Sequence, residues 1–264
     1  MTIQLEQQAG VARVTISHSP RFNAMSRLMW RELRAVFESV QISADVRCVV
    51  ITGEGGNFCS GGDISEYADF RFQESSLRDF HENDVWGGLQ AMLLCDVPMV
   101  AQIDGNCMGA GIEMASCCDV RLASESARFG APIARLGFPM APREAALVAR
   151  EVGLLTARQM LLEAAIFSAA DMKACGFLSR VLAPSELVGE TQATALRIAA
   201  LAPRAARLNK QTLRALNSPP GHARIEQEAM NIIAISADQA YAYADSAEHR
   251  EGIQAFLEKR RPAF

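Results

Sequence analysis

Several features that mark large classes of proteins are missing from this 264-residue sequence. No apolar run reaches the ~18 residues that a membrane-spanning helix needs, and the first residues lack the basic and then apolar pattern of a secretory signal. Lys and Arg form no block, and the formal net charge is −4, so nothing favours binding to nucleic acid or to an anionic membrane surface. We therefore expect neither as a partner.

Motifs for metal, nucleotide and covalent chemistry are also missing. The segment His81-Glu82-Asn83-Asp84-Val85 is not His-Glu-x-x-His, and we expect no metal. Cys59-Ser60-Gly61 lacks the Gly-x-Ser-x-Gly elbow of a serine nucleophile. Residues 53–58, Gly-Glu-Gly-Gly-Asn-Phe, nearly match a dinucleotide fingerprint, but Phe58 replaces its third glycine, which makes this alternative weak.

Cysteine pairs are missing too. None of the seven cysteines belongs to a Cys-x-x-Cys pair, and they are scattered through apolar segments. An odd number in such positions indicates reduced, mostly buried thiols and a cytoplasmic protein. The cysteines are Cys48, Cys59, Cys95, Cys107, Cys117, Cys118 and Cys175.

Half of the residues are hydrophobic, which is enough for one large domain or for a core with a smaller appendage. Residues 3–7 and 11–17 alternate around Ala9-Gly10 and predict a β-hairpin. Ser26 is a candidate cap for a helix to about residue 40, with Leu28, Leu33, Val36 and Phe37 on its apolar face. Buried strands are predicted over residues 47–52 and 98–103, and strands that alternate with helices indicate an α/β fold.

The chain becomes helical from about residue 143. Ser168 to Asp171 form a candidate capping box, and the turn Pro219-Pro220-Gly221 separates two of the last helices. We place a domain boundary near residue 200, between a core of residues 1–200 and a helical region of residues 201–264. The predicted late helices span residues 185–200, 203–215, 225–240 and 247–260.

Two glycine-containing segments, residues 57–64 and 104–113, carry the strongest functional signal. Each follows a predicted strand, and each leads into a predicted helix, whose first N–H groups have no partner within the helix. Two such N–H groups aimed at one point form an oxyanion hole. Glu113 lies just inside the second helix, so the pattern predicts proton chemistry beside a thioester carbonyl.

With these segments in view, the chain resembles the crotonase superfamily, also called the enoyl-CoA hydratase/isomerase family. The resemblance covers nearly the whole chain and rests on five segments in the right order. They are residues 20–25 (Pro-Arg-Phe-Asn-Ala-Met), 58–64 (Phe-Cys-Ser-Gly-Gly-Asp-Ile), 105–119, 129–137 (Phe-Gly-Ala-Pro-Ile-Ala-Arg-Leu-Gly) and 251–260.

The resemblance implies a crotonase fold of repeated ββα units with a helical C-terminal trimerisation region, in a homotrimer or a dimer of trimers. It implies an acyl-CoA thioester as substrate and no further cofactor. The N–H groups of Gly62 and Ala110 are then the oxyanion donors, and Glu113 is the acid or base. The expected substrate-binding residues are Arg21, Ser60, Gly61, Asp63, Ile64, Gly109, Ile133, Phe256 and Lys259, the last two toward the CoA of a neighbouring subunit or simply on an amphipathic helix surface.

One position departs from the family pattern. Hydratases of this family usually carry a second Glu directly after the Pro of Phe-Gly-x-Pro, and here that residue is Ile133. Glu144 either replaces it as the acid or faces solvent in the first turn of a helix. The candidates for the acyl pocket, several of which have plain core packing as their alternative, are Phe22, Met25, Phe70, Phe72, Trp86, Phe138 and Met140.

The sequence therefore favours an enoyl-CoA hydratase-like lyase that works with a single carboxylate through a stabilised enolate. Double-bond isomerisation is the next alternative, because one carboxylate suffices to move a proton from C2 to C4. Decarboxylation and thioester hydrolysis stay open. So does a degenerate acyl-CoA binding protein, which the loss of the second Glu at Ile133 suggests.

Overall fold

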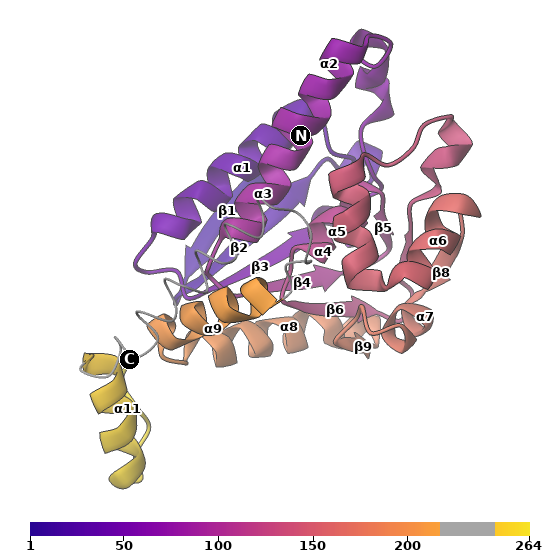
Figure 1. Cartoon of the computed structure of the whole chain (residues 1–264). Helices are drawn as coiled ribbons and strands as arrows, with labels where there is room; N and C mark the ends of the chain where they lie inside the picture. Colours follow the sequence, from indigo (N-terminus) through magenta and orange to yellow (C-terminus); the bar gives the residue numbers. More distant parts are fainter. Residues whose placement is uncertain (217–245) are drawn as a thin grey trace.

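The structure is a computed structural model that describes residues 1–216 and 246–264 (Figure 1). In chain order its strands and helices are β1 (Thr2–Gln8), β2 (Val11–Ser17), α1 (Arg27–Ile42), β3 (Cys48–Gly53), α2 (Glu74–Asp79), α3 (Trp86–Leu94), β4 (Met99–Ile103), β5 (Asn106–Met108), α4 (Ala110–Ser116), β6 (Val120–Ser124), β7 (Arg128–Gly130), α5 (Pro142–Val152), α6 (Leu154–Leu162), β8 (Ile166–Ser168), α7 (Ala169–Ala174), β9 (Arg180–Leu182), α8 (Pro184–Ala199), α9 (Pro203–Leu216) and α11 (Ala247–Leu257). Shorter segments near the site are the 3₁₀ turns η1 (Ser19–Arg21), η3 (Ile64–Asp69) and η5 (Pro132–Leu136), and the π-helical turn η4 (Phe80–Val85).

A six-stranded sheet in the order β1-β2-β3-β4-β6-β9 forms the centre of the molecule. The predicted hairpin is confirmed, since β1 and β2 pair antiparallel from Thr2 opposite Ser17 to Gln8 opposite Val11. The remaining neighbours pair in parallel. Parallel neighbours need a crossover segment, so helices come to cover the sheet, and the fold is α/β as the sequence predicts.

Alternation along β3 assigns the two faces of this sheet. Cys48 and Val50 belong to a cluster with residues of α8, whereas Val49 and Ile51 belong to the larger core that includes α1 and α3. All four residues are buried, as expected for a central strand with both faces covered. Figure 1 shows α8 along one side of the sheet and α1 with α3 along the other.

Helix α1 begins where the sequence predicts it. The Ser26 hydroxyl accepts a hydrogen bond from the Met29 N–H and caps the helix. The predicted apolar face is wrong at one position, because Leu28 is 49% exposed. A residue turns about 100° along a helix, so Leu28 lies about 140° away from the buried Leu33, and the buried stripe begins instead at Met29 and Trp30.

A second, three-stranded sheet lies beside the first and joins β5, β7 and β8. Sequence periodicity did not predict it, since each of these strands has only three residues. The predicted capping box is confirmed: the Ser168 hydroxyl accepts from the Asp171 N–H, and the Asp171 carboxylate accepts from the Ser168 N–H. The box holds the start of α7 directly after β8.

The C-terminal part contains α9 and α11, while the predicted helix over residues 225–240 and the turn Pro219-Pro220-Gly221 lie outside the described residues. Helix α9 is tied to the core, because Arg214 forms an ion pair with Asp96 at 2.7 Å and Lys210 pairs with Asp119 at 2.8 Å. Helix α11 projects from the end of the molecule opposite α2 (Figure 1).

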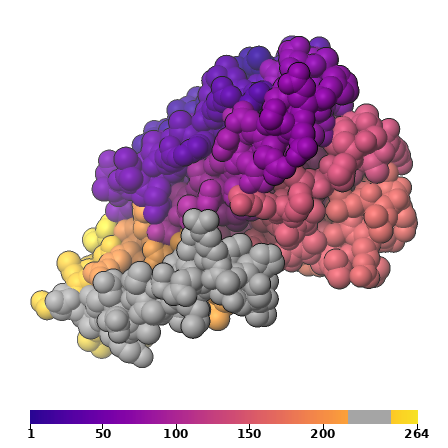
Figure 2. Space-filling view, turned by 45° about the horizontal axis from the view of Figure 1, so that its top comes forward, coloured from indigo at the N-terminus to yellow at the C-terminus, as the bar shows by residue number. Residues whose placement is uncertain are grey.

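No helix among the described residues has the length and apolar character needed to cross a bilayer. In the space-filling view, the N-terminal part and the α5–α7 part meet on one face (Figure 2).

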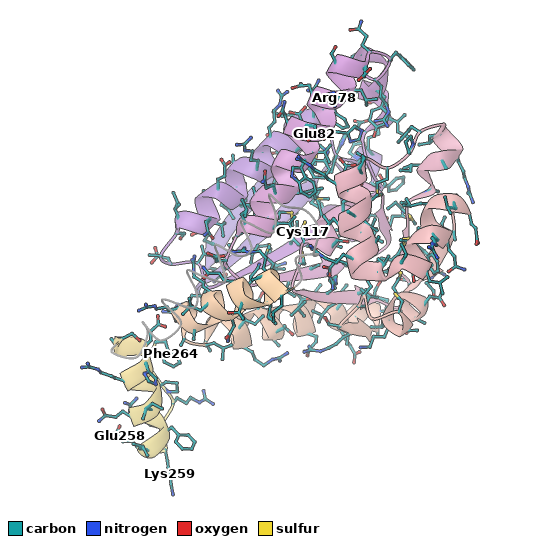
Figure 3. All side chains as sticks on the ribbon, viewed as in Figure 1. Arg78, Glu82, Cys117, Glu258, Lys259 and Phe264 are labelled. Carbon is teal, nitrogen blue, oxygen red and sulfur yellow. The ribbon has the colours of Figure 1, made fainter. Side chains whose placement is uncertain are left out.

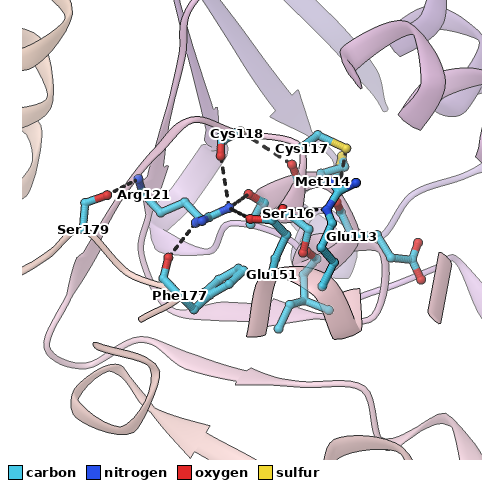
Figure 4. A network of polar contacts seen from close by, with 12 residues as sticks. Glu113, Met114, Ser116, Cys117, Cys118, Arg121, Glu151, Phe177 and Ser179 are labelled. Carbon is cyan, nitrogen blue, oxygen red and sulfur yellow. Dashed lines mark hydrogen bonds and ion pairs between the residues drawn. The ribbon is translucent and has the colours of Figure 1, made fainter. Parts of the chain in front are cut away.

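Arg121 on β6 fixes the end of the short helix α4 (Figure 4). Its guanidinium donates to the carbonyl oxygens of Phe177 at 2.6 Å and Cys118 at 3.0 Å, and it forms an ion pair with Glu151 at 3.0 Å. A cation at the C-terminal end of a helix is also favoured by the helix dipole. Arg121 therefore joins α4, β6 and α5 in one buried network.

Replacing Arg121 with Met is expected to destabilise the protein by about 2–4 kcal/mol, because it leaves the buried carbonyl groups of Phe177 and Cys118 without this donor and leaves Glu151 with Arg150 alone. Urea unfolding followed by circular dichroism measures the loss. Arg158→Met on the exposed side of α6 is the matched control, expected within about 0.5 kcal/mol of wild type. Equal midpoints for the two variants would show that the network does not stabilise the fold.

Candidate active site

The two glycine-containing segments lie side by side in the structure. The Cys59 N–H donates to the Asn106 carbonyl at 2.8 Å, and the Met108 N–H donates to the Cys59 carbonyl at 2.9 Å. One segment leaves β3 and the other leaves β4, which are neighbours in the parallel sheet. The carboxyl ends of these strands therefore bring residues 57–64 and 104–113 together.

Small residues make this contact possible. A side chain at Gly111 would place its Cβ atom 2.8 Å from the Cys59 carbonyl oxygen, so only glycine lets α4 approach the first segment this closely. Gly61 and Gly109 have φ values of +118° and +48°, a region that other residues rarely adopt. A Cβ atom at Gly109 would lie 3.5 Å from the Gly61 Cα atom, so the two turns are in direct contact.

Both predicted oxyanion donors lie at this contact. The Gly61 carbonyl accepts from the Met25 N–H, and the Asp63 N–H donates to the Met25 carbonyl. In a strand-like chain the N–H groups of neighbouring residues face opposite sides, so the Gly62 N–H points away from Met25. Ala110 is the first residue of α4, where an N–H group has no partner within the helix. Neither the Gly62 N–H nor the Ala110 N–H donates to a backbone carbonyl of the described residues. Both N–H groups are therefore available to a ligand.

Glu113 lies in the first turn of α4 and is 6% exposed. Within the described part of the chain, its carboxylate has no hydrogen bond or ion pair. Burial raises the pKa of Glu113 well above 4.5, and the nearby charge of Glu144 raises it further. A carboxyl group whose pKa is raised in this way suits acid–base catalysis.

Tyr67 of η3 borders the same site. A Cβ atom at Gly62 would collide with the Tyr67 hydroxyl oxygen, so the phenol lies directly against this donor residue. Burial raises the pKa of Tyr67 to about 12; the cation of Arg71 opposes the shift, and the charges of Glu113 and Glu144 add to it. Tyr67 is therefore a neutral hydroxyl group near both glutamates.

A cluster of aromatic rings surrounds Tyr67. The Tyr67 ring makes edge contacts with Phe70, Phe80 and Phe138 at centroid distances of 5.8, 6.2 and 5.9 Å. Phe70 and Phe138, two of the predicted acyl-pocket residues, therefore share a cluster with Tyr67, and their contact with an acyl chain stays a prediction. Phe72 is 88% exposed and does not belong to this cluster.

The structure also brings the predicted CoA-binding residues of the N-terminal half together. Ser60 donates from its hydroxyl to the Arg21 carbonyl at 2.8 Å and from its N–H to the Phe22 carbonyl at 3.0 Å. Asp63 accepts hydrogen bonds from the N–H and hydroxyl of Ser65, which caps η3 and orders the loop. Ile64 is exposed beside it.

Phe256 and Lys259 are not brought to this site. Phe256 on α11 is 81% exposed, and Figure 3 shows Lys259 at the far tip of the molecule, away from Cys117 at the end of α4. The described chain is a single copy, so a role toward the CoA of a neighbouring subunit stays a prediction.

Glu144 differs most from its sequence-based alternatives. It occupies the first turn of α5, but its side chain faces inward and only 3% of the residue is exposed, so the solvent-facing interpretation is wrong. Its carboxylate pairs with His81 Nδ1 at 2.9 Å. Ile133 in η5 is half-buried and packs against the core. The sequence did not predict that His81 pairs with Glu144, because no sequence motif marks the π-helical turn in which His81 lies.

Other chemistry has little support in the described residues. No group of three or more His, Cys, Asp and Glu side chains there is placed to hold a metal ion. Six of the seven thiols are buried, as the sequence predicts. Burial raises the pKa of Cys59, the thiol of the first segment, to about 12, which makes it a poor nucleophile.

Comparison with known proteins decides the family. A family model described as enoyl-CoA hydratase/isomerase matches residues 6–264. The chain belongs to this family. A protein named as a probable enoyl-CoA hydratase of Mycobacterium tuberculosis is 30% identical to the chain over 264 residues, which is 100% of the chain and 97% of the relative. The 2,3-dehydroadipyl-CoA hydratase of Escherichia coli is also 30% identical and covers 98% of the chain and 97% of its own length.

Superposition on a solved structure compares the fold of this enoyl-CoA hydratase/isomerase family member with that of a similar protein. The enoyl-CoA hydratase/carnithine racemase from Magnetospirillum magneticum superposes with a TM-score of 0.90 at 33% identity, covering 99% of this chain and 94% of the other. The predicted crotonase fold is therefore confirmed.

Replacing Glu113 with Gln is expected to stabilise the fold. Because its pKa is raised above 4.5, the folded protein keeps this carboxyl protonated to a higher pH than the unfolded chain. Wild type therefore loses stability as the pH rises from 4.5 toward the raised pKa, and the variant does not. We expect a gain of about 1 kcal/mol at neutral pH, or about 2–4 °C in Tm.

Thermal unfolding across this pH range measures the difference. Glu163→Gln at the exposed end of α6 is the control and is expected to leave Tm unchanged. A Glu113→Gln variant less stable than wild type at neutral pH would mean that the carboxylate is favourably paired.

Proposed function

We propose that this protein is an enoyl-CoA hydratase-like lyase that acts on an acyl-CoA thioester. The observation that carries the proposal is the buried carboxyl of Glu113, which has no partner among the described residues, near the Gly62 and Ala110 amides, which have no backbone acceptor among them. Membership of the enoyl-CoA hydratase/isomerase family supports it. So do relatives named short-chain-enoyl-CoA hydratase and crotonyl-CoA hydratase, each 28% identical.

In this proposal the thioester oxygen accepts hydrogen bonds from Gly62 and Ala110. Negative charge grows on that oxygen as the enolate forms, and preorganised N–H donors stabilise it without reorganisation. Glu113 exchanges the proton at C2. Ser60 and Ile64 belong to the first segment, residues 57–64, and Arg21 lies beside Ser60; these three residues would hold the CoA moiety. The mechanism requires no cofactor besides the CoA thioester itself.

The same proposal covers assembly and location. Leu213 and Leu216 on α9 and Leu257 on α11 are large apolar residues that are exposed in a single chain. A homotrimer or dimer of trimers would bury such residues. The buried thiols support a cytoplasmic location.

Double-bond isomerisation is the second candidate, and Ile133 favours it. An isoleucine neither holds nor activates water, whereas a shift of the double bond needs only one carboxylate to move a proton between C2 and C4. Decarboxylation or acyl-CoA binding without turnover are further outcomes that the following experiment separates.

Glu113→Gln is expected to lower kcat by about 10²–10⁴-fold, because the acid–base group is lost while the oxyanion donors stay. Hydration of crotonyl-CoA is followed by ultraviolet absorbance, and isomerisation of a 3-enoyl-CoA by mass spectrometry. The control Glu163→Gln should keep full activity. Isomerisation without hydration in wild type would change the assignment to isomerase, and tight CoA binding with neither reaction would indicate a binding protein.

Ala110→Pro is expected to lower kcat by about 10²–10³-fold, because it removes one oxyanion N–H. Proline is tolerated at the first position of a helix, so α4 should stay intact. Ala247→Pro makes the same change at the first position of α11, far from the site, and should leave kcat unchanged. Steady-state kinetics on the substrate that wild type turns over compare the two, and equal kcat values would exclude Ala110 as a donor.

A further inference from the structure

We propose that Glu144 and His81 together form a second proton-transfer group of this active site, the group that activates water. This inference rests on the proposed function. The sequence offers no carboxylate at Ile133, yet the structure supplies one from another element. Glu144 is 3% exposed and accepts from, or donates to, His81 Nδ1 at 2.9 Å.

The two glutamates border one space. Glu113 and Glu144 come from α4 and α5, which contact each other, and the charge of Glu144 adds to the raised pKa of Glu113. Both carboxylates in turn raise the pKa of Tyr67, whose hydroxyl lies against the donor residue Gly62. In the proposal, a thioester bound at the oxyanion donors has Glu113 on α4 and Glu144 on the contacting helix α5 near it.

The position of His81 is fixed by its helical turn and by neighbouring contacts. It lies in the π-helical turn η4, and such turns occur often at functional sites. The Phe80 ring packs edge-on against the imidazole at 5.0 Å. Next to the pair, Arg143 of α5 forms an ion pair with Glu82 of η4 at 3.0 Å. Two adjacent contacts therefore hold the first turn of α5 against η4.

The different surroundings of the glutamates divide the roles. Glu113 is buried with no partner among the described residues, which favours its protonated form. Glu144 instead has an imidazole partner, which orients its carboxylate and gives a proton a route to the ring. In hydration, Glu144 takes a proton from water as the water oxygen bonds to C3 and the C2–C3 π electrons move to the thioester enolate. Glu113 then donates its proton to C2.

The cycle closes without an outside reactant. The reaction adds one water molecule, and the proton gained by Glu144 must return to Glu113. His81 is 19% exposed at its side chain, so its second ring nitrogen can exchange protons with solvent. The charged and titratable groups that face the pair are Glu113 of α4, Tyr67 of η3, Arg71, and the neighbouring Arg143 and Glu82.

The test measures hydration and isomerisation in the same variants of the full chain. Glu144→Gln is expected to lower the kcat of hydration by about 10²–10⁴-fold and to leave isomerisation within a few-fold, because a C2-to-C4 shift needs only Glu113. His81→Asn should lower hydration less. Glu163→Gln, the exposed control at the end of α6, should leave both reactions unchanged.

Two readouts separate a chemical role from a structural one. Removing the Glu144 charge lowers the pKa of Glu113, so the acidic limb of the isomerisation profile should shift to lower pH in Glu144→Gln. Formate should restore hydration to Glu144→Ala, because a small carboxylate fits the vacated space. A structural role would produce neither effect.

The outcomes are distinct. Hydration that survives in Glu144→Gln, or falls together with isomerisation in a folded variant, would overturn the inference and leave the proposed role of Glu113 standing. Wild type that isomerises but does not hydrate would also overturn it. Neither reaction in wild type would overturn the proposed function and this inference together.

Discussion

The close contact between two backbone turns is the constraint on which the rest of the site depends. Residues 57–64 and 104–113 leave neighbouring strands and hydrogen-bond to each other through Cys59, Asn106 and Met108. Gly111 allows the approach because a Cβ atom there would meet the Cys59 carbonyl oxygen. The contact sets the spacing of the two free amides and also the start of α4, and hence the place of Glu113.

The site also concentrates unfavourable electrostatics. Glu113 is buried in the first turn of α4 with no hydrogen bond or ion pair to the described residues, and the nearby charge of Glu144 on α5 raises its pKa further. At the other end of α4, Arg121 satisfies buried carbonyl groups and pairs with Glu151. Arg121 also contacts the Ala115 carbonyl at 3.4 Å, so this favourable network is attached to the C-terminal end of the seven-residue helix that carries Glu113, and it holds that helix in place.

The sequence predicted what local rules determine. Ser26 and Ser168 cap helices as expected, because capping needs only near neighbours. The two glycine segments were found for a similar reason, since turn residues directly after buried strands mark an exposed strand end. The approach of His81 to Glu144 was not predictable, because 63 positions separate them and a π-helical turn has no sequence signature. Burial of Glu144 in turn follows from that tertiary contact, while its local sequence suggested the solvent-exposed start of a helix.

The segment between β3 and β4 has a consequence for how this protein diverges from its relatives. It contributes Tyr67 and Phe70 to the aromatic cluster and His81 to the pair with Glu144. In the proposed function this segment would take part in both acyl recognition, with Phe138, and water activation, with Glu144 of α5. An insertion or deletion between β3 and β4 is then expected to alter both at once, so a new acyl preference and a new reaction outcome would be inherited together.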